Sequence, residues 1–200
     1  MKSAIVEIVG ISRYSQGRAY QRDVQKKHKE NSEDYEERTW KERVHAKPDG
    51  KVFIPGIALS NCIKEAAKFL SIQVPGKGKA TYTKHFDAGI NIFDDVELDV
   101  LKDDVEGEWL FVPGDGQQGG GKRVWKCFPF IEVGKWGGEF LITITDDAIT
   151  EDVLRTVLLA AGNQIGIGRW RPRNRGQYGR FEVKSLKFLD TEETMAAMAV

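Results

Sequence analysis

One stretch of the chain, residues 166–180, gathers side chains that could bind a polyanion. Its sequence, GIGRWRPRNRGQYGR, has five arginines, four glycines and no acidic residue. Guanidinium groups attract phosphates, exposed bases stack on aromatic rings, and glycines bring backbone amides close to a ligand. We therefore expect this arginine-rich loop to contact single-stranded nucleic acid through Arg169, Trp170, Arg171, Arg173, Arg175, Tyr178 and Arg180. The alternatives are a surface turn whose arginines pair with carboxylates elsewhere, and a contact between subunits.

The chain as a whole is electrically balanced, which makes this local clustering informative. Its 200 residues include 30 basic and 30 acidic side chains, which excludes a generally basic coat protein but not a local binding surface. No apolar run is long enough to span a membrane, and the start, MKSAIVEIVG, is typical of a strand and not of a secretion signal. Cys62 and Cys127 are too few for a disulfide framework or a zinc site. We expect a cytoplasmic protein without cofactor or metal.

The elements that must position the loop belong to both classes of secondary structure. Residues 3–11 and 181–189 are rich in β-branched and apolar residues and predict the first and last strands. Apolar residues recur at helical spacing in 56–70 and 150–162. Further strands are expected at 88–101, at 108–112, and at 124–133 paired with 137–145. This order predicts an α+β, ferredoxin-like (RRM-like) antiparallel sheet with helices on one face and two long insertions.

The insertions and the C-terminal end complete the expected organisation of one domain over residues 1–190. Residues 13–51 are highly charged and lack an apolar stripe, so we expect an insertion that lies outside the core. Residues 112–137 contain a glycine-rich stretch and are expected to form a hairpin. Residues 191–200 are expected to be a loose tail.

Two motifs resemble those of the RAMP superfamily of CRISPR-associated proteins. The first, VFIPGIALSNCIKEAAKFL, is similar to the segment in which a Pro-Gly pair opens the first helix, here with Pro55, Gly56, Ser60, Asn61 and Lys64. The second, GNQIGIGRWRPRNRGQYGRFEV, resembles the glycine-rich loop between the last helix and the closing strand, with Gly176, Tyr178, Gly179, Arg180 and Phe181 at its end. Together the two motifs cover about forty residues, in the positions that a ferredoxin-like topology requires.

The resemblance implies roles for residues outside the arginine-rich loop. It implies that the backbone subunits that polymerise along guide RNA are the nearest members, and that the hairpin at 112–137 is a thumb that inserts between nucleotides. The implied contacts with nucleic acid are Arg13, Tyr14, Arg18, Ser60, Asn61, Lys64, Lys77, Lys79, Lys122, Arg123 and Trp125. The chain is short for such a subunit and has more arginines in its loop, so a free-standing relative from a phage or mobile element is an equal alternative.

Catalysis is the less favoured reading of these residues. Some RAMP proteins cleave RNA with a histidine, and His28, His45 and His85 are the candidates here, together with Asp115 of the glycine-rich stretch. Metal-independent cleavage requires an acid and a base within reach of the reacting oxygens, and no such set is evident in the sequence. Neighbouring acids such as Asp94 and Asp95 point to opposite faces of a strand, which disfavours a metal site.

The sequence thus predicts a non-catalytic protein that binds single-stranded RNA or DNA, RNA being favoured, without regard to base sequence. It is expected to form a homo-oligomer or filament along the strand, with CRISPR or phage proteins as further partners. The alternatives are a metal-independent endoribonuclease of the RAMP type, a protein-binding mimic of a CRISPR subunit, and a phage protein that anneals single-stranded DNA.

Overall fold

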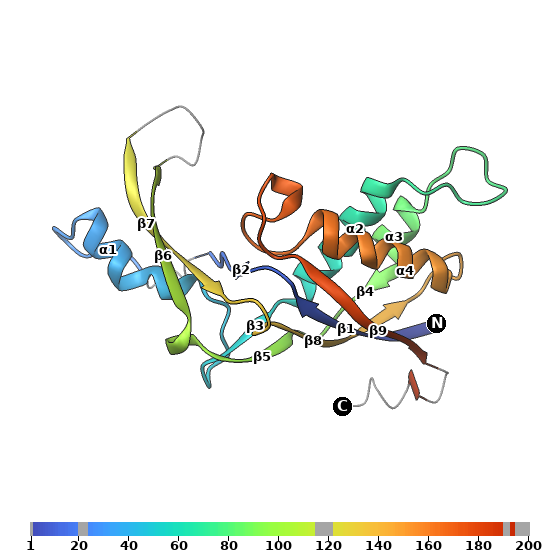
Figure 1. The fold of residues 1–200 in the computed structure, drawn as a ribbon, viewed down its shortest axis with the longest axis horizontal. Coiled ribbons are helices and arrows are strands. Elements are labelled where there is room, and N and C mark those ends of the chain that lie inside the picture. Colours follow the sequence, from blue (N-terminus) through green and yellow to red (C-terminus); the bar gives the residue numbers. More distant parts are fainter. Residues whose placement is uncertain (1, 20–23, 115–121, 190–192, 195–200) are drawn as a thin grey trace.

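A four-stranded antiparallel sheet forms the centre of the larger part of the molecule (Figure 1). The structure is a computed structural model that describes residues 2–19, 24–114, 122–189 and 193–194. The order of the strands is β4-β8-β1-β9, and each strand is antiparallel to its neighbours. These strands are β1 (Lys2–Gly10), β4 (Ile90–Asn91), β8 (Gly137–Ile144) and β9 (Phe181–Leu189).

Helices cover one face of this sheet and enclose the core. They are α2 (Gly56–Leu70), α3 (Thr83–Gly89) and α4 (Glu151–Ala160). Ala4, Val6 and Ile8 alternate along β1 and are buried in one cluster with Leu59 of α2 and Leu154 of α4. The order β1-α2-β4-β8-α4-β9 is that of a ferredoxin-like fold, which confirms the predicted α+β class. None of the described helices is both long and apolar enough to cross a membrane.

The last helix leads directly into the arginine-rich loop. The side chain of Thr150 accepts a hydrogen bond from the backbone N–H of Val153, which caps the start of α4. The end of α4 widens into a single π-helical turn at Ala161–Ile165. A Cβ atom on Gly162 would lie 2.1 Å from the carbonyl oxygen of Phe181, so this turn requires a glycine to pack against the first residue of β9.

A second unit, which we call the arm, projects beside the core (Figure 1). It contains β2 (Tyr14–Ser15), α1 (Ser32–Thr39), the 3₁₀ helix η1 (Trp40–Arg43), β6 (Glu106–Pro113) and β7 (Arg123–Ile131). β6 and β7 form a long hairpin, β2 pairs with the other edge of β7, and α1 and η1 pack against β7. The expected pairing of 124–133 with 137–145 is wrong, because β7 stays with β6 while β8 inserts between β1 and β4.

Short elements connect the arm to the core. β3 (Lys51–Ile54) and β5 (Val96–Leu101) pair with each other, and the 3₁₀ helix η2 (Lys102–Asp104) leads from β5 into the hairpin. A further 3₁₀ helix, η4 (Pro172–Asn174), lies within the arginine-rich loop.

The charged insertion at 13–51 contributes buried residues, contrary to the expectation from its sequence. Val44 belongs to the hydrophobic core, and the side chains of Glu36 and Arg43 are buried as an ion pair. Arg43 Nη2 donates to Glu36 Oε2 at 2.6 Å, Glu36 Oε1 accepts from the backbone N–H of Cys127, and Arg43 Nη1 donates to the Cys127 carbonyl. Two charges can be buried here because each neutralises the other and both form hydrogen bonds with the backbone of Cys127 on β7.

Two predictions fall largely outside the described residues. The tip of the expected hairpin, including Asp115, belongs to residues 115–121, which lie outside the described part of the chain. Of the expected loose tail at 191–200, only residues 193 and 194 are described, and these are helical.

Candidate nucleic-acid interface

The arginine-rich loop lies along residues 11–15, which follow β1. The backbone N–H of Gly179 donates to the Arg13 carbonyl at 2.6 Å, and that of Arg169 donates to the Ser15 carbonyl at 2.8 Å. The N–H of Ile11 in turn donates to the Arg180 carbonyl. Because β1 and β9 are neighbours in the sheet, the end of β1 meets the start of β9. Two segments that are far apart in the sequence therefore form one surface.

The glycines of the loop serve its internal packing. A Cβ atom on Gly179 would lie 1.8 Å from the Ile167 carbonyl oxygen, and one on Gly176 would lie 1.7 Å from the Trp170 carbonyl oxygen. The N–H of Gly176 donates to the carbonyl of Arg171, as that of Gly179 does to Arg13. The expectation that these two amides bind phosphate is wrong, because both already have partners within the protein.

Two of the five arginines share one carboxylate of α2. Arg171 Nη2 lies 3.0 Å from Glu65 Oε2, and Arg173 Nε lies 2.8 Å from Glu65 Oε1. This arrangement agrees in part with the alternative in which the arginines pair with acids of the same chain. One carboxylate balances only one guanidinium, so the cluster of three side chains keeps a positive charge.

The residues of α2 that the RAMP resemblance singles out differ in exposure. Asn61 is exposed, and it lies one helical turn before Glu65 on the same face of the helix. Lys64 is half-buried, whereas Ser60 is buried. A buried hydroxyl cannot contact a bound strand, so Ser60 is excluded from the candidate surface.

Residues 13–18 also divide into accessible and buried side chains. The guanidinium of Arg13 lies 4.4 Å from the ring centre of Phe130 and 2.8 Å from Glu132, whose hydrogen bond raises the pKa of Arg13. Tyr14 is only 2% exposed, and burial raises the pKa of its hydroxyl far above the usual value. Tyr14 is excluded as a base-stacking residue, because its ring packs inside the protein. Arg18 is half-buried at the edge of the arm.

Arg175 and Arg180 complete the positive part of the surface. Both side chains are exposed, and neither has an ion pair within the part of the chain that the structure describes. The backbone N–H of Arg180 donates to Ser12 Oγ, which fixes the chain while its side chain faces solvent. Arg175 has a φ of 63°, a backbone conformation that few residues other than glycine and asparagine adopt readily.

A cleft of about 340 Å³ separates the arginine-rich loop from the hairpin of the arm. The guanidinium of Arg169 lies 4.9 Å from the ring centre of Phe128 on β7, and the ring of Trp170 meets the same ring edge-on at 4.7 Å. Trp170 has a φ of 52°, which is strained for a bulky residue and is typical of functional sites. The residues that line the cleft are Val112, Pro113, Gly114, Lys126, Phe128, Arg169 and Trp170.

Lys126 and Phe128 give the hairpin wall of the cleft a cation and an aromatic ring, and neither was among the residues expected from the sequence. Both lie on β7, where alternate side chains share one face of the hairpin. Tyr178 of the loop reaches the same face of the hairpin, where its hydroxyl donates to Glu108 of β6 at 3.2 Å. The alternation of residues 124–128 could have indicated that Lys126 and Trp125 point to opposite faces, but not which face meets the loop.

Five other residues that the sequence predicts to contact nucleic acid do not line the cleft. Trp125 and Arg123 are on the opposite face of the hairpin, where the Trp125 ring contacts the ring of Phe111, and Lys122 directly precedes β7. Lys77 and Lys79 are exposed in the loop between α2 and α3, which projects at the end of the molecule opposite the arm (Figure 1). The structure therefore does not bring Lys77 and Lys79 to the arginine-rich loop.

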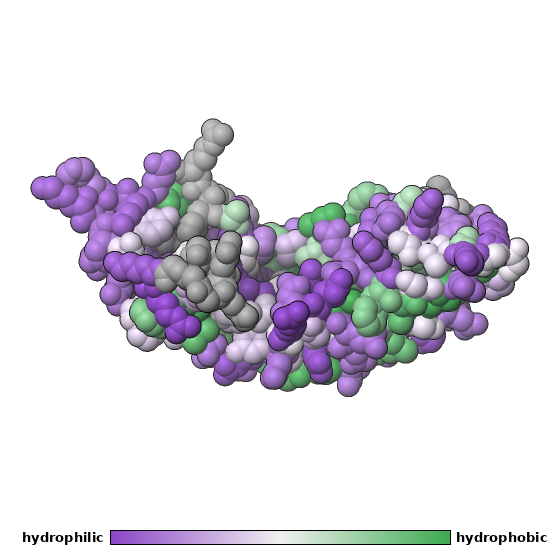
Figure 2. Space-filling model, turned by 90° about the horizontal axis from the view of Figure 1, so that it is seen from above, coloured by the Kyte–Doolittle hydropathy of each residue, from purple (hydrophilic) through white to green (hydrophobic). Residues whose placement is uncertain are grey.

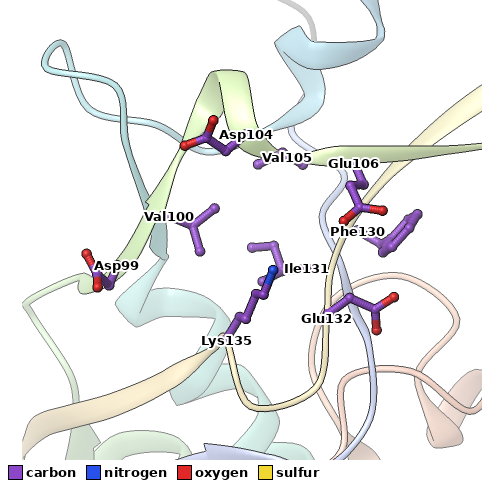
Figure 3. A pocket seen from close by; sticks show the side chains of 9 residues that line it. All are labelled: Asp99, Val100, Asp104, Val105, Glu106, Phe130, Ile131, Glu132 and Lys135. Atoms are coloured by element: carbon purple, nitrogen blue, oxygen red, sulfur yellow. The ribbon is translucent and has the colours of Figure 1, made fainter.

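A second pocket, of about 310 Å³, is acidic and lies at the base of the arm (Figure 3). Carboxylates surround its apolar floor, and Lys135 is the lysine that points toward them. The charged residues of its lining are Asp99, Asp104, Glu106, Glu132 and Lys135. The carboxylates outnumber the one lysine in this lining, so the pocket is unfavourable for a phosphate group.

The three histidines line neither the cleft nor the loop. His28 lies in an exposed turn, and His45 is half-buried between η1 and β3. His85 Nδ1 lies 2.6 Å from Asp146 Oδ2, in a pair that joins α3 to the segment after β8. The chain has three histidines, so no histidine is available for a nuclease site in the cleft.

The outline of the molecule is elongated and curved, with the arm at one end and the helices of the core at the other (Figure 2). Hydrophilic residues cover much of the face that this view shows. The cleft lies between the arm and the core, where β7 faces the loop that precedes β9.

Comparison with known proteins finds similarity among solved structures. No protein-family model and no curated protein matches the chain. A chain in the cryo-EM structure of the Type III-B Cmr-beta bound to cognate target RNA is similar, with a TM-score of 0.54 and 14% sequence identity. The match covers 94% of this chain and 61% of that one, so the present chain spans about three fifths of its length. At this identity the similarity shows that the two chains share a fold.

Proposed function

We propose that the protein binds single-stranded nucleic acid, with RNA favoured, in the cleft between the arginine-rich loop and the hairpin. The observation that carries the proposal is the cleft itself, in which Lys126 and Arg169 lie beside Trp170 and Phe128. Cations next to aromatic rings are the two features that proteins use to bind a strand without reading its sequence. The similar chain comes from a structure of Cmr-beta bound to cognate target RNA, which supports RNA as the first ligand to test.

The charge distribution favours binding on one side of an otherwise neutral molecule. Arg175 and Arg180 extend the positive surface from the cleft along the loop, whereas the acidic pocket lies at the base of the arm. Each phosphate that the protein neutralises releases counterions, so affinity should fall steeply with salt. For a single strand, the slope of log affinity against log salt is about −0.7 per phosphate.

Three substitutions test this surface directly. Lys126→Gln, Arg175→Asn and Arg180→Gln remove three positive charges, and asparagine tolerates the positive φ of Arg175. We expect the combined variant to lose most of its affinity for an RNA oligonucleotide of mixed sequence, with a salt slope lower by about 2 if each cation meets one phosphate. Fluorescence anisotropy at several salt concentrations measures both quantities.

A charge-matched variant controls for general electrostatic attraction. Lys77→Gln, Lys79→Gln and Lys84→Gln also remove three charges, from exposed positions on or beside α3. This variant should bind RNA as the wild type does. Equal loss of affinity in both triple variants would contradict a localised site, and absence of binding by the wild type would refute the proposed function.

We also propose that several copies assemble along one strand, on the basis of the resemblance to backbone subunits. Light scattering should then show complexes whose mass increases with the length of the RNA. A mass that stays at one protein per strand would contradict assembly and would indicate that the protein binds as a monomer. The same samples, incubated in EDTA and analysed on a gel, test the endoribonuclease alternative through the length of the recovered RNA.

A further inference from the structure

A further pocket adjoins the acidic pocket at the base of the arm and extends it toward β1 and β8. Its volume is about 410 Å³, and Asp99 and Lys135 line both pockets. We call the two pockets together the acidic groove. The floor is apolar, and Leu98, Val105 and Ile131 within it are at most 5% exposed. An apolar floor below charged groups suits a side chain with an aliphatic stem and a cationic end.

The negative charge of the acidic groove is not balanced within the protein. Of its six carboxylates, those of Glu97 and Glu132 form ion pairs with basic residues around the groove. The described lining includes one cation, Lys135. Four carboxylates have no ion pair within the part of the chain that the structure describes, namely those of Glu7, Asp99, Asp104 and Glu106. Like charges held close together repel each other, so a cationic partner is favoured here.

The complementary charge lies at the end of the molecule opposite the arm, in the loop between α2 and α3 (Figure 1). Residues 74–84, which we call the lysine loop, contain Lys77, Lys79 and Lys84 and no acidic residue. These three side chains are exposed, and none has an ion pair among the described residues. The cleft does not include them, so the proposed function leaves the charge of the lysine loop without a role.

The lysine loop is a preformed protrusion. Its backbone is closed by hydrogen bonds from the N–H of Val74 to the Ala80 carbonyl at 2.8 Å and from the N–H of Lys77 to the Val74 carbonyl at 3.1 Å. Cβ atoms on Gly76 and Gly78 would meet nothing within 4 Å, so the tip of the loop stands clear of the rest of the molecule. A segment that already has its bound shape loses little conformational entropy on binding.

We propose that the acidic groove binds the lysine loop of a second copy of this chain. The two surfaces lie toward opposite ends of one molecule, so a lysine loop does not reach the groove of its own chain (Figure 1). Each contact leaves one free groove and one free loop, and the assembly grows unless it closes into a ring. The groove and the cleft share no lining residue. The inference therefore goes beyond the proposed function, because the contact requires no nucleic acid.

Charge reversal on either surface tests this pairing in the absence of nucleic acid. Asp99→Lys with Asp104→Lys reverses the groove, and Lys77→Glu with Lys79→Glu reverses the loop, all at exposed positions. By sedimentation velocity, the wild type should associate at about 0.1 M salt and dissociate at about 1 M, since the screening length falls from about 10 Å to about 3 Å. Each double variant should be monomeric. An equimolar mixture of the two should associate again, because every groove then meets a loop of opposite charge.

A matched control reverses two exposed acids outside both surfaces, Glu37→Lys and Asp152→Lys, and should associate as the wild type does. Loss of association in this control would overturn the inference, because general charge and not the pairing would then be responsible. A monomeric wild type would also overturn it, as would wild-type association by either double variant.

The mixture gives the most specific outcome. If both double variants are monomeric and their mixture stays monomeric, the groove and the loop are not partners. Both variants keep the cleft, so each should bind an RNA strand that holds one copy as the wild type does. Absence of RNA binding by the wild type would refute the proposed function and leave the contact between copies standing.

Discussion

The core and the arm of this protein are held together by different kinds of interaction. In the core, apolar side chains from β1, α2 and α4 form one buried cluster around the four-stranded sheet. In the arm, the buried ion pair of Glu36 and Arg43 fastens α1 and η1 to the backbone of Cys127 on β7. Apolar packing is spread over many contacts and is non-directional, whereas a buried ion pair depends on the geometry of a few atoms.

This difference indicates which part of the molecule determines the shape of the cleft. The loop wall of the cleft is fixed by backbone hydrogen bonds between residues 11–15 and 166–180, at the end of the core sheet. The hairpin wall depends on where the arm sits, and therefore on the pair of Glu36 and Arg43. A change in the core should lower stability without altering the cleft, and a change in the arm should alter the cleft.

The largest effect is expected from Arg43→Ala. The substitution leaves the carboxylate of Glu36 buried without its partner, which should cost about 3–5 kcal/mol and loosen the hairpin. Nucleic-acid affinity should fall together with stability, as measured by urea unfolding and by RNA titration below the transition. The double variant Glu36→Leu and Arg43→Met removes both charges and should recover most of the stability. Failure to recover it would indicate that the hydrogen bonds to Cys127, not the charges, hold the arm.

A change in the core should have a similar cost in stability and none in binding. Leu154→Ala in α4 removes a fully buried side chain and should lower the free energy of unfolding by about 3 kcal/mol. At temperatures where the variant stays folded, its affinity for RNA should equal that of the wild type. A loss of affinity comparable to that of Arg43→Ala would show that core and arm are not separable in this way.

A smaller effect, an increase in RNA affinity, is expected from Glu65→Gln. Glu65 belongs to α2 of the core and binds both Arg171 and Arg173, so neutralising it frees positive charge next to the cleft. RNA affinity should rise a few fold, and the salt slope should steepen by about 0.7 for each additional phosphate contact. A weaker affinity would mean that Glu65 is needed to position the two arginines.

The smallest effect concerns His45, which lies where the arm joins the core. Burial is the main cause that lowers the pKa of His45, and Arg18 contributes, while Asp95 opposes the change. The unfolded chain therefore binds this proton more readily, so stability should fall as pH decreases through the ordinary pKa of about 6.5. Carboxylates with lowered pKa, such as those of Glu97 and Asp146, lose their contribution only at lower pH.

Urea midpoints between about pH 7 and pH 5, a range centred near the ordinary histidine pKa, isolate this contribution. His45→Gln should show a flatter dependence than the wild type over that range. Identical curves would place the pH dependence in other groups.

The sequence was most informative where a residue pattern reports on local structure. The helical spacing of 56–70 and of 150–162 and the strand at 181–189 correspond closely to α2, α4 and β9. The pairing of 124–133 with 137–145 could not be judged in the same way, because strand partners depend on contacts between distant residues. The sequence also did not show which side chains are exposed. Tyr14 and Ser60 have polar side chains that suit a binding surface, yet both are buried.

By itself, the sequence indicated the first and last strands and the two longest helices, and hence the ferredoxin-like class, because apolar periodicity follows the geometry of each element. It also determined that positive charge gathers in residues 166–180 of a neutral chain. Only the tertiary structure decided that Glu65 holds two of those arginines, that Gly176 and Gly179 pack against their own loop, and that Lys126 and Phe128 lie across a cleft from it. These contacts join residues up to 108 positions apart, and the packing of α2 and of the arm against the loop brings them together.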